Sequence, residues 1–381
     1  TTAAAAETTA AAAETTAAAA EAPAAAENAD DVPDEMTSSD GKYEIAFVTD
    51  VGQLKDKSFN QGTFDGVKLY AANAGKSYKY YQPAGGDQAT DDDRYDAMKL
   101  AVENGAKVVV CAGFMQGTAL QKAAEEFTDT RFVFIDGWAL GLSNVAGIAF
   151  QEEQCGYLAG YAAVMDGYTK LGFTGGGGGA NAACDRYGYG FVQGADAAAQ
   201  ELGQNIEINY FYGGQFYGDA NITSRMEGWY SNGTQVVFAC GGGIYTSAVE
   251  AALKSNGYVI GVDVDQNYIG ANGVADGTYA YNPFITSAMK GLSEAVNTAL
   301  ADIEAGSWGD IAGSNGNFGL EDGDYIGLPT DADSWNFESF TTDEYEEVKG
   351  KIKSGEITVD NSSDDATKPT VSEFTTVNYI Q

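Results

Sequence analysis

Histidine is absent from this sequence of 381 residues. Its absence excludes Ser-His-Asp and Cys-His catalysis and histidine-ligated zinc, which are among the commonest kinds of functional site. Cysteine is scarce, and its four positions lie far apart without CxxC spacing: Cys111, Cys155, Cys184 and Cys240. Neither a zinc knuckle nor a redox dithiol is therefore indicated. Each cysteine stands among apolar or small residues, which predicts small buried side chains and leaves a disulfide open.

Basic residues are also few. The chain has 20 Lys and Arg against 55 Asp and Glu, so its formal net charge is −35 at pH 7. A field of this sign repels nucleic acid and anionic lipid, and no cluster of Lys and Arg is available to bind a phosphate backbone. A purine or nucleoside carries no phosphate and is not excluded. Long apolar runs are missing too, since none approaches the roughly 20 residues that cross a bilayer.

Residues 1–21 are three copies of TTAAAAE, and low-complexity sequence continues to residue 41. Alanine favours helix, but the repeats hold no Leu or Ile for a coiled-coil seam. Because this segment buries little apolar area, it is predicted to be a partly helical, solvated tether. The chain begins with Thr, which is typical of a processed exported protein whose signal peptide and any lipidated cysteine lie outside this sequence.

From residue 42 apolar strands alternate with amphipathic helices, which is typical of βαβ units in a parallel sheet. The first set of strands is predicted at 43–50, 77–83, 107–113, 131–137 and 144–150, with helices at 60–74, 93–105 and 117–127. A second set follows, with helices at 155–167, 187–202, 224–233 and 246–257 and strands at 170–176, 207–214, 234–242 and 258–265. The sequence therefore predicts two α/β lobes in tandem.

Residues 45–66 form the stretch from which the predicted site is built. An apolar run ends at Asp50, and a helix can start near Ser58. Ligands of open α/β sheets lie beyond the carboxyl ends of the strands, so Asp50, Phe59 and Asn60 are expected to face one cleft. The helix amino terminus adds backbone donors there. In the alternative interpretation, Asp50 and Ser58 only cap local structure and Phe59 belongs to the core.

Acidic residues end several predicted strands: Asp50, Asp136, Asp263 and Asp265. Such acids can hold a metal, form a general acid/base pair or bind polar ligand groups. No DxDxDG loop is present, and nothing in their spacing indicates a glycosidase pair. Recognition of a neutral polar ligand is favoured, because an ionised Asp accepts two hydrogen bonds from adjacent hydroxyl or N–H groups.

Glycines and aromatic residues complete the predicted cleft. The run Gly175–Gly179 lacks the GKS or GKT ending of a phosphate loop and is predicted to be a flexible loop at a lobe edge. Gly241–Gly243 would let the backbone approach a ligand, or form a tight turn. Phe59 from the first lobe and Phe216 from the second are predicted to stack on the two faces of a flat ring. Two other rings could replace Phe216, namely Tyr217 or Tyr187.

Several collinear motifs are shared with a known family: TDVG with DKSFNQGTFDG, FIDG, AFQEEQCGYLAGYAA, GFTGG, RYGYGFVQGA, GGQFYGDAN, VIGVDVDQ and VKGKIKSGEITV. Over roughly residues 42–359 the chain resembles the basic membrane protein family of substrate-binding lipoproteins of ABC transporters, whose best-understood branch binds purine nucleosides. The resemblance implies a type I periplasmic binding protein fold, with two Rossmann-like α/β lobes joined by a three-strand hinge and preceded by the low-complexity tether.

The same plan implies the domain boundaries. Lobe 1 would hold residues 42–150 and about 279–313, and lobe 2 residues 151–278 and about 314–360. Residues 1–41 would be a linker and residues 361–381 a C-terminal tail. The hinge crossings are expected near residue 150, near 267–278 and near 313–319.

The resemblance also implies roles for the site residues. Asp50, Asn60 and Asp136 would contact the base, and Asp263 or Asp265 would hold the ribose hydroxyls. The family uses a lysine beside the ribose. Its best positional match here is Lys290, for which an exposed helix lysine is the alternative interpretation. Two glycines would lie against the sugar, Gly241 and Gly242.

These observations predict a cell-surface substrate-binding protein of an ABC importer that closes around a nucleoside, with a purine base preferred. No catalysis, cofactor or metal is predicted. The expected partners are the ligand and an ABC permease with its ATPase subunits, while the membrane is reached only through a lipid anchor outside this sequence. The alternatives are a receptor for another small polar ligand, such as a sugar or signalling molecule, a nucleoside hydrolase, or an adhesive surface protein.

Overall fold

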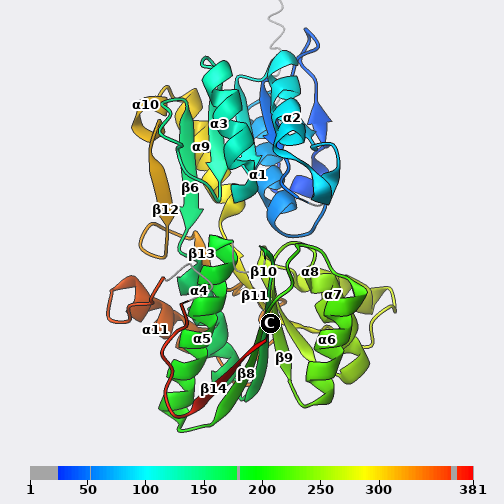
Figure 1. The fold of residues 1–381 in the computed structure, drawn as a ribbon, viewed down its shortest axis with the longest axis vertical. Helices are drawn as coiled ribbons and strands as arrows, with labels where there is room; N and C mark the ends of the chain where they lie inside the picture. The colour runs from blue at the N-terminus through cyan, green and yellow to red at the C-terminus, as the bar shows by residue number, and fades with distance from the viewer. Residues whose placement is uncertain (1–24, 52, 178–180, 362–366, 381) are drawn as a thin grey trace, which may run out of the picture.

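Two α/β lobes lie one above the other in the computed structural model (Figure 1), which describes residues 25–380 except 52, 178–180 and 362–366. Each lobe is built on a seven-stranded sheet. The predicted two-lobed α/β fold is confirmed. Two segments for which predictions were made lie outside the described residues. They are the TTAAAAE repeats and residues 178–180, which comprise the end of the glycine run and the alanine after it.

The first lobe has the strand order β1-β3-β2-β4-β5-β6-β12, parallel except for β1. Its strands are β1 (Glu35–Met36), β2 (Ile45–Val48), β3 (Tyr78–Tyr81), β4 (Val108–Ala112), β5 (Arg131–Ile135), β6 (Val145–Phe150) and β12 (Asn315–Phe318). Helices α1 (Phe59–Asn73) and α9 (Leu292–Glu304) cover one face, and α2 (Asp91–Glu103) and α3 (Gly117–Glu126) cover the other. The short α10 (Trp308–Ile311) follows α9. Central strands such as β4 are apolar throughout because both of their faces are buried.

The second lobe has the strand order β13-β11-β10-β9-β7-β8-β14, parallel except for β13. Its strands are β7 (Lys170–Gly175), β8 (Ile206–Tyr212), β9 (Val236–Cys240), β10 (Tyr258–Asp263), β11 (Phe284–Lys290), β13 (Ile326–Gly327) and β14 (Thr375–Ile380). One face is covered by α4 (Glu152–Met165) and α5 (Ala182–Leu202). The other is covered by α6 (Ala220–Ser231), α7 (Tyr245–Ser255) and α8 (Asn267–Ala275), while α11 (Thr342–Lys353) packs on α4.

Helices α4 and α5 pack with their backbones in contact. A Cβ added at Gly156 or Gly160 of α4 would overlap backbone atoms of α5, and one at Gly190 or Gly194 would overlap backbone atoms of α4. Only glycine allows this approach. The contact fixes the start of α4 against the start of α5, where charged residues of the site described below are located.

The hinge differs from the predicted one at its second crossing. The chain passes from the first sheet to the second between β6 and α4 and returns between β11 and α9, at Gly291. The range of about 279–313 was predicted for lobe 1, but it contains β11, which pairs in parallel with β10 over Val259–Asp263 and so belongs to the second sheet. The glycine-rich residues 267–278 therefore form α8 and a turn within lobe 2. The last crossing follows β12 and leads to β13, over residues 319–325.

Both predicted flanking segments contribute to the folded lobes. Within the predicted linker 1–41, β1 pairs antiparallel with β3. Within the predicted tail 361–381, β14 pairs in parallel with β8 along its whole length. These pairings were not predicted because one strand is two residues long and the other follows a polar segment.

All four cysteines are buried and free, as the prediction of small buried side chains requires. Among the described residues, no helix is long and apolar enough to span a bilayer. No group of three or more potential metal-ligating His, Cys, Asp or Glu residues occurs within the described ranges.

Candidate ligand-binding site

A cavity of about 220 Å³ lies between the two lobes, beyond the carboxyl ends of β2, β4 and β5 on one side and of β9 and β10 on the other. This is the edge at which ligands of open α/β sheets bind. Every predicted site residue except Asp265 lines the cavity: Asp50, Phe59, Asn60, Asp136, Phe216, Gly241, Gly242, Asp263 and Lys290. Residues from both lobes therefore form one wall around a space for a small molecule.

The loop between β2 and α1 is shaped by Asp56 and Asn60. The Asp56 carboxylate accepts hydrogen bonds from the backbone N–H groups of Ser58, Asn60 and Gln61, and so satisfies the open donors at the start of α1. The Asn60 side chain accepts from the backbone N–H of Asp50 at 2.9 Å and donates to the carbonyl of Val51 at 3.1 Å. Asn60 thus positions Asp50, and its contact with a base remains a prediction.

Asp50 is buried at the end of β2, and its Oδ1 has no hydrogen-bond partner among the described residues. Gly113, which follows β4 with φ of +89°, leaves room for its carboxylate, since an added Cβ would overlap Oδ2 and Cγ of Asp50. Burial raises the pKa of Asp50 to about 7, against the lowering effect of the nearby Arg94 charge. An acceptor without a partner at a cavity wall is available to a ligand.

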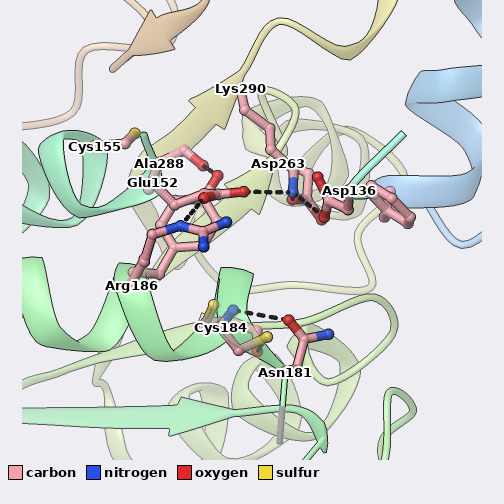
Figure 2. A network of polar contacts seen from close by, with 12 residues as sticks. Asp136, Glu152, Cys155, Asn181, Cys184, Arg186, Asp263, Ala288 and Lys290 are labelled. Carbon is pink, nitrogen blue, oxygen red and sulfur yellow. Dashed lines mark hydrogen bonds and ion pairs between the residues drawn. The ribbon is translucent and has the colours of Figure 1, made fainter. Parts of the chain in front are cut away.

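Lys290 lies at the centre of a buried charge network (Figure 2). Its Nζ is 2.6 Å from Oδ2 of Asp136, 3.3 Å from Oε1 of Glu152 and 3.7 Å from Oδ1 of Asp263. Arg186 of α5 pairs with Glu152 at 2.6 Å from the other side. The alternative interpretation of Lys290 as an exposed helix residue is wrong, because it ends β11 and is 4% exposed. Lys290 precedes the hinge crossing at Gly291, and its ion pairs link Asp136 of lobe 1 to Asp263 of lobe 2.

The electrostatic balance of this network favours a charged lysine. Although burial alone would lower the pKa of Lys290, the charges of Asp136, Glu152 and Asp263 raise it. Burial raises the pKa of Asp136 to about 6 despite Lys290, and burial also raises the pKa of Asp263. The pKa of Glu152 is lowered, since the Arg186 and Lys290 charges outweigh its burial. Both aspartates have positive φ, +53° at Asp136 and +68° at Asp263, a strained backbone that is concentrated at functional sites.

Two half-buried aromatic rings, Phe59 and Phe216, face the cavity from different lobes. Glycines leave the space that the Phe216 ring occupies, because an added Cβ at Gly176 would overlap it and one at Gly241 would press on it. Gly242 has φ of +49°, and the N–H of Gly243 donates to the Phe216 carbonyl at 2.8 Å. These glycines therefore form the tight turn that presents Phe216.

The other proposed rings are placed differently. Tyr187 lines the cavity but is 1% exposed, and its hydroxyl donates to the Ala288 carbonyl at 3.3 Å, so its ring is part of the core. Tyr217 is 39% exposed at the cavity. Phe216 therefore matches the predicted stacking role better than Tyr187.

Asp265 does not reach the cavity. Its carboxylate accepts from the backbone N–H of Asn267 at 3.0 Å and from the hydroxyl of Ser334 at 2.5 Å, so it fixes the loop before α8. Of the two acids proposed for the ribose, only Asp263 lines the cavity. The prediction failed for Asp265 because Val264 between the two acids points toward α1, where Gly62 leaves space for it.

Sequence reasoning missed several residues of the site. Glu152 and Arg186 complete the charge network, and Asp56, Asn181 and Tyr245 line the cavity. The signal for the first two was available, because Glu152 begins a helix directly after a predicted strand and Arg186 opens a shared motif. Asn181 could have been recognised as the N-cap of α5, since its Oδ1 accepts from the N–H of Cys184 at 3.0 Å.

Direct contacts hold the lobes together beside the cavity. The Ser58 hydroxyl donates to Oδ2 of Asp263 at 2.6 Å, and Nε2 of Gln266 donates to the Lys57 carbonyl at 2.9 Å. The structure thus shows the two lobes in contact beside the cavity. Both lobes contribute side chains to the cavity wall.

The fold and the interlobe cavity define a two-lobed binding protein of the type I periplasmic class. Residues 43–363 match the family model described as ABC transporter substrate-binding protein PnrA-like, abbreviated Bmp. The chain therefore belongs to the Bmp family of ABC transporter substrate-binding proteins. This is a family of non-enzymatic binding proteins, so the prediction of binding without catalysis is confirmed, and membership implies a small ligand and permease and ATPase partners.

Individual relatives agree with this assignment. The CD4+ T-cell-stimulating antigen of Listeria innocua is 30% identical over 86% of this chain and 90% of its own length. The ABC transporter nucleoside-binding protein BmpA of Lactococcus lactis is 30% identical over 68% of this chain and 73% of its own length. Among solved structures, an ABC transporter solute-binding protein from Aeropyrum pernix has a TM-score of 0.70 at 21% identity, covering 85% of this chain and 95% of that one.

Proposed function

We propose that the protein binds a nucleoside, with a purine base preferred, and delivers it to an ABC permease. The observation that carries the proposal is the pair Phe59 and Phe216 at one cavity, together with the acids Asp50, Asp136 and Asp263. A flat heterocycle between two rings would gain about 1–3 kcal/mol per stacked face, a large share of the roughly 8 kcal/mol behind micromolar affinity. The similarity to a relative named as a nucleoside-binding protein supports the same ligand class.

In this proposal Asp50 and Asp136 contact the base, while Asp263, Lys290 and the Gly241–Gly242 turn contact the ribose. Asp136 and Asp50 each keep one oxygen without a hydrogen-bond partner in the part of the chain that the structure describes, which suits donors on a base edge. The protein would act at the cell surface, held there by a lipid anchor. That placement and the purine preference are inferred from the family alone.

The direct test is calorimetric titration of the purified protein with inosine, guanosine, adenosine, uridine and ribose. Binding of the purine nucleosides, weaker binding of uridine and no heat from ribose are expected. Heat from ribose alone, with none from any nucleoside, would establish a sugar receptor and refute the proposal.

Gly113→Ala is expected to weaken nucleoside binding at least about tenfold, since the new Cβ must displace the Asp50 carboxylate from the cavity wall. Gly141→Ala is the matched control: Gly141 also lies in lobe 1 with positive φ, +73°, but nothing lies within 4 Å of an added Cβ. Both variants place a Cβ at a positive φ, but only Gly113→Ala also meets the Asp50 carboxylate. Equal affinities in calorimetry would show that Asp50 does not contact the ligand.

A further inference from the structure

Two of the four cysteines, Cys184 and Cys240, lie together in the wall of the ligand cavity. They are 56 residues apart in the sequence and have no CxxC spacing, but α5 packs on β9 and brings the third residue of α5 against the last residue of β9. The Sγ atom of Cys184 is 3.7 Å from the carbonyl oxygen of Cys240. The fold therefore places a pair of free thiols beside the candidate ligand-binding residues.

The other two cysteines differ from this pair. Cys111 lies within β4, and the Sγ atom of Cys155 donates to the carbonyls of Met289 and Gly327 at 3.2 and 3.3 Å. Neither lines the cavity, and both are fully enclosed at 0% exposure. Cys184 is 5% exposed and lines the cavity, so a small molecule in the cavity can reach its thiol.

The surroundings of the two sulfur atoms suit different chemical roles. Cys184 is in the first turn of α5, a helix of 21 residues, where the partial positive charge of the helix amino terminus stabilises a thiolate, the nucleophilic form. Burial and a side-chain hydrogen bond with Cys184 raise the pKa of the Cys240 thiol well above its ordinary value. Cys184 is therefore the thiol that reacts first, and Cys240 is the neighbouring thiol that can react with it next.

We propose that Cys184 and Cys240 form an oxidisable dithiol on the cavity wall, and that a hydroperoxide converts it to a disulfide that lowers ligand affinity. The Cys184 sulfur attacks the hydroperoxide, whose O–O bond breaks. The sulfur takes up an OH group as a sulfenic acid, and the alcohol or water that leaves takes up the thiol proton. The Cys240 sulfur then attacks that of Cys184, the S–S bond forms, and the OH group leaves with the Cys240 proton as water. Two electrons pass from the thiols to the hydroperoxide.

The disulfide changes the cavity wall because both cysteines adjoin residues of the site. A disulfide holds its sulfur atoms about 2.05 Å apart, so its formation draws the start of α5 and the end of β9 toward each other. The Cys240 carbonyl accepts from the N–H of Gly176 at 2.8 Å, and Cys240 leads into the Gly241–Gly243 turn that presents Phe216. The Phe216 ring is therefore displaced from the cavity. The effect on affinity rests on the proposed nucleoside function, whereas formation of the disulfide does not.

Peptide mapping by mass spectrometry, after treatment of the reduced ligand-free protein with hydrogen peroxide, tests the thiol site. A disulfide between Cys184 and Cys240 is expected, while Cys111 and Cys155 keep their thiols. Cys240→Ala should stop at the sulfenic acid of Cys184, which dimedone captures, and Cys184→Ala should leave Cys240 reduced. The control variant that combines Cys111→Ala with Cys155→Ala should form the same disulfide. Retention of all four thiols by the unaltered protein, or equal oxidation of all four, would overturn the proposal.

Calorimetric titration with guanosine before and after peroxide treatment measures the effect on binding. The affinity should fall at least about tenfold on oxidation and return when a phosphine reduces the disulfide. The affinity of Cys184→Ala should not change on the same treatment, which controls for oxidation of methionine. A disulfide that forms without loss of affinity would overturn the effect on binding. A protein that forms the disulfide but binds no nucleoside when reduced would refute the proposed function and leave the thiol site established.

Discussion

Replacing Lys290 by Met is expected to lower the free energy of unfolding by about 3–5 kcal/mol and to abolish nucleoside binding. The lysine is buried within 4.0 Å of Asp136, Glu152 and Asp263. Without it, these carboxylates would lie close together in a low-dielectric environment, with Arg186 as the remaining cation that the described residues pair with them. Folding would then require protonation of at least one acid, and the shape of the cavity wall would change.

Urea unfolding of the ligand-free protein and calorimetric titration with guanosine measure the two effects. Lys349→Met is the control, because Lys349 is a surface lysine of α11 that pairs with Glu346, and such pairs contribute about 1 kcal/mol or less. The Lys290→Met protein should regain part of its stability at acidic pH, where the orphaned carboxylates take up protons. Stability equal to that of the control at neutral pH would contradict the central role of Lys290.

Replacing Phe59 by Ala is expected to weaken nucleoside binding at least about tenfold, and the Phe216→Ala change to do the same. Each ring is half-buried at the cavity, on a different lobe, so loss of either exposes one face of the bound base. Phe59 also lies 4.8 Å from Nζ of Lys290, measured to the ring centroid, so its loss removes one wall around the charge network. The melting temperature of the ligand-free protein should change little, because neither ring belongs to the fully buried core.

Calorimetric titration and thermal melting separate binding from stability in these variants. Phe59→Leu keeps apolar volume without a flat face and should retain only part of the affinity. Phe211→Ala removes a half-buried ring of lobe 2 that lies outside the cavity, against Arg225, and should bind normally. If both Phe59→Ala and Phe216→Ala bind as tightly as the Phe211→Ala control, the ligand does not lie between these rings.

Strands β2–β10 and helices α1–α7 were predictable because apolar runs and amphipathic stretches alternate clearly over residues 43–265. Helix starts were less accurate: α5 begins at Ala182 and not at 187, and α6 at Ala220 and not at 224. In each case a polar residue outside the apolar pattern caps the helix, Asn181 and Asp219 respectively. Strand β11 was missed because residues 284–290 were not predicted as a strand, and the expected domain plan placed about 279–313 in lobe 1.

The candidate site was predictable to the extent that strand ends converge on one edge. Asp50, Asp136 and Asp263 follow strands and reach the cavity, and this follows from parallel topology. What could not be predicted is how each polar group divides its hydrogen bonds between protein and ligand. Asn60 bonds to its own loop, and the distinction between Asp263 and Asp265 depends on the direction of two side chains.

The pairing of β14 with β8 also sets the order in which the chain can fold. Strand β8 ends at Tyr212, whereas its edge partner is formed by Thr375–Ile380, so nearly all of the described chain must be synthesised before the second sheet is complete. The first sheet likewise waits for β12, which lies far along the chain from β6. Neither lobe can reach its full set of strands while the ribosome is still making the middle of the protein, and contacts this distant in sequence form slowly. A nascent chain of this topology therefore stays incompletely folded until β14 has been synthesised.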